Sequence, residues 1–109
     1  MTTVTFHSDR GRITGFDVKG HSGLASQGED ILCAAVTSAV RLTECAVNDV
    51  LGLMASVKVG TASISFQLPG GLAPAAESTC QTLMTALMVY FSQLHEEYPD
   101  NLLVKEKDD

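Results

Sequence analysis

The segment from Gly20 to Thr37, GHSGLASQGEDILCAAVT, contains a histidine, several glycines and a cysteine close to the expected start of a helix. Asp30 is a residue type that caps helix N-termini, and the apolar residues that begin at Ile31 recur at helical spacing. The sequence therefore predicts a helix over residues 31 to about 51–53, with Cys33 in its first turn.

This expected position would make Cys33 chemically special. The free N–H groups and the positive end of the helix dipole lower the pKa of a thiol, and the same N–H groups can hold an oxyanion. His21 is the natural general base, and the glycines at 20, 23 and 28 allow the chain to return toward the cysteine. The residues alone leave a second interpretation open, in which Cys33 is a buried, inert packing residue.

The pieces G-H-S-G and G-E-D-I-L-C-A-A-V-T together resemble the active-site segment of Prp, a family of bacterial ribosomal-processing cysteine proteases. The order of elements is similar over nearly the whole chain. The resemblance implies that His21 and Cys33 are the catalytic residues. It aligns Asp30 with an acidic residue next to the cysteine, in a supporting role beside its helix-capping role. Thr37 falls where such sequences often have serine, and it keeps the hydroxyl.

The resemblance also implies a substrate, namely the N-terminal extension of a protein of the large ribosomal subunit. The expected peptide is extended and largely apolar, with aromatic residues just before the cut. The loop that would cover it contains Gly20, Ser22, Gly23, Leu24 and Gly28. Leu24 is a candidate contact for the aromatic side chain, or it packs the closed loop onto the body of the protein. The resemblance further implies a homodimer.

Two other functions fit some of these residues. One is a small dimeric binding or assembly protein associated with the ribosome, in which Cys33 is only packed. The other is a metal site made by His21, Asp30 and Cys33. Their spacing matches no structural zinc pattern and supplies three ligands rather than four, so we expect no metal and no cofactor.

Composition limits the class of protein. The chain has 109 residues, of which 45% are hydrophobic, and this fits a single globular domain over residues 1–109. The net charge of −6 argues against a nucleic-acid partner. We see no signal peptide and no apolar run of membrane-spanning length. The three cysteines are widely spaced and odd in number, which favours a reducing compartment and a cytoplasmic location.

The remaining elements follow from periodicity. Strands are expected at residues 2–7 and 12–19 around a turn at 8–11, and at 57–59 and 62–68 around a turn at 60–61. A second helix is expected over 73–98, then a possible short strand over 102–106 that ends in a solvated tail. The order β-β-α-β-β-α predicts a two-layer α+β domain, with two helices on one face of a mainly antiparallel sheet. His7, Cys45 and Cys80 are interpreted as residues without a chemical role.

Overall fold

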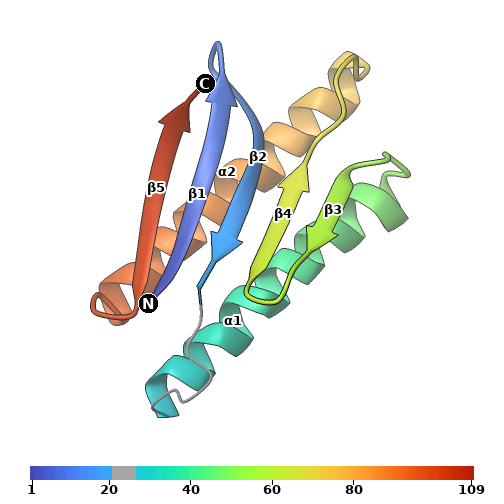
Figure 1. Cartoon of the computed structure of the whole chain (residues 1–109). Helices are drawn as coiled ribbons and strands as arrows, with labels where there is room; N and C mark the ends of the chain where they lie inside the picture. The colour runs from blue at the N-terminus through green and yellow to red at the C-terminus, as the bar shows by residue number, and fades with distance from the viewer. Residues whose placement is uncertain (21–26) are drawn as a thin grey trace.

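The computed structural model describes residues 1–20 and 27–109, and of residues 27–30 the backbone only. Figure 1 shows the elements in their order along the chain. They are β1 (Thr2–Asp9), β2 (Arg12–Lys19), α1 (Gln27–Glu44), the π-helix η1 (Cys45–Val50), β3 (Ser56–Val59), β4 (Ser63–Gln67), α2 (Pro74–Glu97) and β5 (Leu102–Asp108).

The five strands form one sheet in the order β3-β4-β2-β1-β5. All neighbours are antiparallel except β5, which runs parallel to β1. Both helices lie against the same face of this sheet (Figure 1). The expected two-layer α+β fold and the order of its elements are confirmed. Residues 105–109 are exposed, as expected for a solvated tail, but most of them belong to a strand, because β5 extends to Asp108 and its backbone pairs with β1 as far as Ser8.

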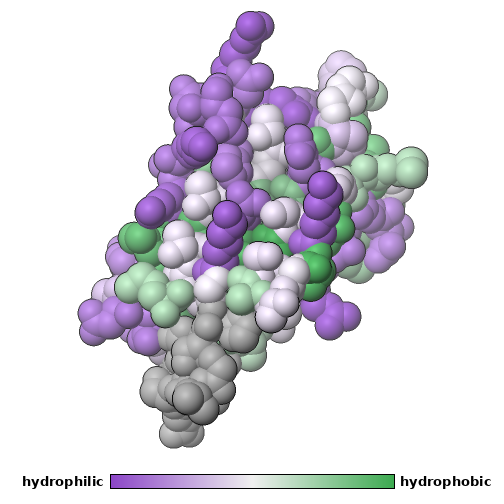
Figure 2. Space-filling model, viewed as in Figure 1, coloured by the Kyte–Doolittle hydropathy of each residue, from purple (hydrophilic) through white to green (hydrophobic). Residues whose placement is uncertain are grey.

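The core lies between the sheet and the helices and is built around phenylalanine rings. Phe16 stacks on Phe66 with ring centroids 5.1 Å apart, and Phe6 packs against Phe16 at 5.5 Å and against Phe91 of α2 at 6.3 Å. Strands β1 and β2 alternate these core residues with polar ones, so the other face of the sheet is polar (Figure 2). The side chains inside are therefore those that strand periodicity predicts.

The first helix is long, and its second part differs from the expectation. After Glu44 the chain continues as η1, whose i→i+5 pairing widens the turn. The side chain of Asn48 holds the following segment in place. It donates a hydrogen bond to the carbonyl of Ala55 and accepts one from the N–H of Ala55. Val50 and Cys45 are exposed, so neither side chain contributes to the core, although Val50 falls within the apolar helical pattern and Cys45 is of a type that usually packs inside.

The expectation that the chain has no apolar run of membrane-spanning length is wrong for residues 31–50. By length and composition only, this stretch of 20 residues is long and apolar enough to cross a membrane, with a mean hydropathy of 1.3. Its charged residues Arg41, Glu44 and Asp49 are unfavourable in a lipid core. Four of its apolar residues, Leu32, Val36, Val40 and Val47, are buried in the core of the domain. We interpret it as the core helix of a globular domain.

The N-terminal part of α2 is tied to the start of β2 by side chains. Gln81 donates to the carbonyl of Ile13 at 2.9 Å and accepts from its N–H at 2.8 Å, as a neighbouring strand would. Arg12 forms an ion pair with Glu77 at 2.6 Å and donates to the carbonyl of Pro69. These contacts hold α2 against the sheet where β4 no longer pairs with β2.

Gly15 allows β2 and β4 to approach closely, and this generates the first prediction. A Cβ at this position would lie 2.2 Å from the carbonyl oxygen of Phe66, which is backbone and cannot rotate away. We expect Gly15→Ala to lower the free energy of unfolding by about 2 kcal/mol or more in urea denaturation. Gly70→Ala is the matched control, since a Cβ there meets no atom within 4 Å. Equal stability of the two variants would contradict the close approach.

Candidate active site

A cavity of about 370 Å³ lies beside Cys33, where α1, the end of β2 and the turn between β3 and β4 meet. Cys33 and Thr37, one helical turn apart, form its wall on α1. Val18 and Gly20 contribute from β2 and the residue after it. The remaining lining residues are Thr2, Val36, Val59, Gly60, Thr61, Ala62, Ser63 and Ile64. A cysteine thiol and a threonine hydroxyl therefore share a mostly apolar cavity.

The fold positions Cys33 through its neighbours in the helix. Leu32 and Val36 are 0% and 2% exposed, and they fix α1 against the sheet. Cys33, which lies between them, is left half-buried at the edge of that contact. The thiol is thereby shielded on one side and open to the cavity on the other. Such a partly exposed position is where a cysteine can react.

The opposite wall is fixed by Gly20. Its N–H donates to the carbonyl of Ala62 at 2.9 Å, which fastens the end of β2 to the turn between β3 and β4. Gly20 has φ +79°, a conformation that side chains disfavour, and a Cβ there would lie 2.7 Å from the carbonyl oxygen of Met1. The backbone of Gly20 thus has a conformation that favours glycine, while the return of the chain toward Cys33 stays a prediction, because it involves residues outside the described ranges. Gly20 lies on the cavity wall, directly before His21 in sequence.

The structure brings together three of the candidate residues, Cys33, Thr37 and Gly20. His21, Ser22, Gly23 and Leu24 lie outside the described residues. The pairing of His21 with Cys33 and the contact of Leu24 with substrate therefore stay predictions.

The start of the helix differs from the expectation. Because α1 begins at Gln27, Asp30 lies inside the helix and is not its N-cap, and Gly28 belongs to the helix and not to a loop. Cys33 is in the second turn, so its own N–H falls within the i→i−4 pattern. The unpaired N–H groups of the helix lie earlier, at residues 27–30. The expected oxyanion site formed by N–H groups next to Cys33 does not follow from this helix start.

A sequence signal for the earlier start was present. Positions 26–29 read Ser-Gln-Gly-Glu, the S-x-x-E pattern of a capping box. Asp30 also fits the N-cap position, because the apolar run begins directly after it. An acidic residue in the first turn is also favourable to the helix dipole, so the residue type alone did not distinguish the two positions.

The contribution of residues 59–64 to the cavity was not anticipated. The turn at Gly60–Thr61 was correctly expected, but its place beside Cys33 depends on the pairing of β4 with β2. These strands are separated in sequence by α1, η1 and β3, and periodicity reports only which face of a strand is buried. In the sequence, only the family resemblance over nearly the whole chain connects these residues with the surroundings of Cys33.

The other thiols lie in different environments. Cys80 is fully buried in α2, and its pKa is raised by burial and by the Glu77 carboxylate, against a smaller opposite effect of Arg12. It therefore remains a protonated thiol over the physiological range. Cys45 is exposed on η1. Within residues 1–20 and 31–109, no cluster of three His, Cys, Asp or Glu side chains is arranged to hold a metal ion.

Comparison with known proteins identifies the family. The model of the family described as cysteine protease Prp matches residues 1–103. The chain belongs to the Prp family of cysteine proteases. It is therefore a peptide hydrolase, which sets aside a binding protein without catalysis. Ribosomal processing cysteine protease Prp of Bacillus subtilis (strain 168) is 31% identical over 106 residues, which cover 95% of this chain and 94% of that protein.

Solved structures show the same fold as this Prp-family chain. The crystal structure of SMU.848 from Streptococcus mutans has a TM-score of 0.85 at 21% identity, covering 100% of this chain and 96% of that one. The structure of the essential ribosomal processing protease Prp from S. aureus, in complex with a substrate peptide, has a TM-score of 0.83 at 18% identity. It covers 98% of this chain and 100% of that one.

The cavity generates the second prediction. We expect Ala62→Phe to place a large side chain into the space beside Cys33, while the backbone bond from Gly20 is kept. Peptide cleavage should fall about ten-fold or more, corresponding to about 1.4 kcal/mol in kcat/KM. Alkylation of Cys33 by iodoacetamide, which is small, should change much less, as measured by mass spectrometry of the labelled peptide. Loss of both in the same proportion would mean that the variant disturbs α1 and not the cavity.

Proposed function

We propose that this protease removes the N-terminal extension of a protein of the large ribosomal subunit, with Cys33 as nucleophile and His21 as general base. The observation that carries the assignment of the nucleophile is the position of Cys33, half-buried on a cavity wall. Ribosomal processing is part of the name of the Bacillus subtilis relative, which matches nearly the whole chain. The structure of the S. aureus protease holds a substrate peptide, and this supports a peptide substrate here.

The proposed chemistry is acyl transfer in two steps. His21 takes the proton from the Cys33 thiol, and the sulfur attacks the carbonyl carbon of the scissile bond. The tetrahedral intermediate collapses to a thioester, and the departing amine takes the proton from His21. Water, deprotonated by His21, then attacks the thioester. This releases the carboxylate product and restores the thiol with its proton.

The lining of the cavity favours an apolar substrate segment. Val18, Val36, Val59 and Ile64 supply apolar surface, and burial of an aromatic side chain there would be favourable. This matches the peptide that the family resemblance implies. The loop that contains Leu24 is proposed to close over the bound peptide.

Thr37 is proposed to support the reaction from the same wall. Its hydroxyl lies one turn after Cys33 and can donate a hydrogen bond to the substrate or to the developing oxyanion. Asp30 is proposed to influence the charge of the site from its place in the first turn of α1. Because α1 begins before Asp30, this role no longer competes with capping.

We further propose that the enzyme is cytoplasmic and does not bind nucleic acid. Its three cysteines are free thiols, which suits a reducing compartment. The net charge of −6 opposes binding to phosphate backbones. An acidic enzyme also attracts a basic peptide segment.

A homodimer is proposed on the outer side of the helices. Only 28% of the most apolar stretch within residues 31–50 is buried, and Leu42 is 71% exposed. A groove of about 480 Å³ lies between α1 and α2, lined by Leu42, Ala46, Leu83, Tyr90 and other small or apolar residues. A second copy of the chain, with the same apolar face, would cover it.

The assignment of the nucleophile generates the third prediction. Cys33→Ala should abolish cleavage of the ribosomal protein precursor, measured as truncation by mass spectrometry, with the unfolding curve preserved. Cys80→Ala is a matched control for a buried thiol and should cost about 1 kcal/mol of stability while activity remains. Cys45→Ala, at an exposed position, should change neither property measurably. Loss of cleavage in all three variants would point to a structural requirement for thiols and contradict the assignment.

The fourth prediction concerns the dimer. Leu42→Lys should shift the protein toward the monomer in sedimentation velocity, because a charge would have to be buried in the contact. Leu103→Lys is the control, since this exposed leucine belongs to β5 in the sheet. If the unaltered protein sediments as a monomer at tens of micromolar, the dimer proposal is wrong.

A further inference from the structure

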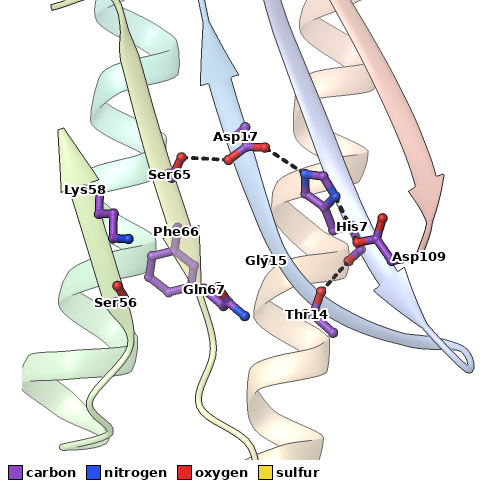
Figure 3. Close-up of a pocket in the computed structure, with 10 residues that line it drawn as sticks. All are labelled: His7, Thr14, Gly15, Asp17, Ser56, Lys58, Ser65, Phe66, Gln67 and Asp109. Atoms are coloured by element: carbon purple, nitrogen blue, oxygen red, sulfur yellow. Dashed lines mark hydrogen bonds and ion pairs between the residues drawn. The ribbon is translucent and has the colours of Figure 1, made fainter. Parts of the chain in front are cut away.

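A second cavity, of about 330 Å³, opens on the polar face of the sheet (Figure 3). Among the described residues, it shares no lining residue with the cavity beside Cys33. His7 and Asp17 point into the second cavity, because they alternate along their strands with the core residues Phe6 and Phe16. The cavity is lined by His7, Thr14, Gly15, Asp17, Ser56, Lys58, Ser65, Phe66, Gln67 and Asp109.

His7 bridges two carboxylates in this cavity. Its Nε2 lies 2.7 Å from Oδ2 of Asp17, and its Nδ1 lies 3.1 Å from Oδ2 of Asp109 (Figure 3). The His7 side chain is 24% exposed, Asp17 27% and Asp109 45%. Ser65 donates to the other oxygen of Asp17 at 2.7 Å. The expected partly packed side chain is found, and its two partners come from other elements of the fold, which local sequence does not indicate.

This geometry depends on the protonation of the imidazole. Two ionised carboxylates can only accept hydrogen bonds, so both ring nitrogens must carry a proton to satisfy both contacts. A neutral ring has one N–H. Asp17 is the closer and better-held partner, and it would keep that N–H. The lone pair on Nδ1 would then face an oxygen of Asp109, and this contact would become repulsive.

We propose that His7 is a proton-dependent latch that fastens the end of β5 to the sheet and releases it when the imidazole loses its second proton. The same end of β5 is held by the N–H of Asp109, which donates to the carbonyl of Ser8 at 2.8 Å. The latch therefore acts on the last residues of a sheet edge. It does not depend on the proposed function of Cys33.

The charged groups around His7 define what else acts on the latch. Strand β2 contributes Asp17 and Lys19, and β3 contributes Lys58. Strand β5 contributes Lys107 and Asp108, and Asp109 follows directly after it. Lys107 lies 3.9 Å from Asp109 and is paired with His7 across the β1–β5 ladder. When His7 is neutral, this lysine would still attract the carboxylate of Asp109. The release is therefore local, and β5 as a whole stays paired.

The direction of the pH dependence follows from the two kinds of group. Burial by itself would raise the pKa of Asp17, but the hydrogen bonds from Ser65 and His7, with the positive charges of His7 and Lys19, lower it below its ordinary value of 3.8. The stabilisation from Asp17 is thus present above about pH 4 and is lost as the pH falls below it. The contact of His7 with Asp109 changes in the opposite direction, because it needs the proton on Nδ1 and is lost when that proton leaves.

The fifth prediction tests the latch with double-mutant cycles on the full chain, in urea denaturation at pH 5.5 and pH 8. His7→Gln and Asp109→Asn should be coupled about two- to five-fold in the unfolding equilibrium constant at pH 5.5 and be uncoupled at pH 8. The control cycle of His7→Gln with Asp17→Asn should stay coupled at pH 8, since one N–H remains on the neutral ring. Equal coupling of His7 and Asp109 at both pH values, or none at pH 5.5, would overturn the proposal.

A measurement on the unaltered protein is independent of whether these variants fold. In ¹⁵N and ¹³C NMR, both ring nitrogens of His7 should carry protons at pH 5.5, and Nε2 alone at pH 8. The side-chain carboxyl resonance of Asp109 should shift with the same midpoint as the ring. A ring that titrates while the resonances of Asp109 and Ser8 stay unchanged would exclude the latch.

Discussion

The pairing of β2 with β4 is the constraint on which the rest of the structure depends. These strands are neighbours in the sheet but are separated in the chain by α1, η1 and β3. Their close approach requires Gly15, because no side chain fits between its Cα and the backbone of Phe66. The pair places Phe16 on Phe66 in the core and Asp17 opposite Ser65 on the outer face. One strand contact thus organises both sides of the sheet.

The same pairing assembles the cavity beside Cys33. Beyond its last ladder residues, Gly20 donates to Ala62, and this bond brings the end of β2 and the turn after β3 to one side of α1. Cys33 and Thr37 face that space because their neighbours Leu32 and Val36 are buried in the core and fix the orientation of the helix. The exposure of this thiol to the cavity therefore depends on the packing of its helical neighbours.

Much of the fold could be predicted from the sequence, because its signals are local. Alternation in residues 2–7 and 12–19 and helical spacing over 73–98 identified the elements and their buried faces. Features that depend on distant contacts were missed, such as the partners of His7 and the extension of β5 to Asp108. The wide turn of η1 was missed for another reason, since hydrophobic spacing does not distinguish it from a regular helix over six residues. For the candidate site, the expected place of Cys33 near a helix start distinguished it from the other two cysteines, and the resemblance supported that choice.

The two faces of the sheet meet different physical demands, and this explains where chemistry can reside. On the covered face, a titratable group such as Cys80 is held in its neutral form by burial, whereas Cys33, the proposed nucleophile, is half-buried at the margin of the core. On the polar face, charged groups are tolerated only in hydrogen-bonded sets, and His7 lies within such a set. Strand β1 connects the two regions, because Thr2 lines the cavity of Cys33 and His7 lies near the other end of the same strand. The proposed latch and the cavity of Cys33 therefore lie at opposite ends of β1, with the buried side chains of Val4 and Phe6 between them.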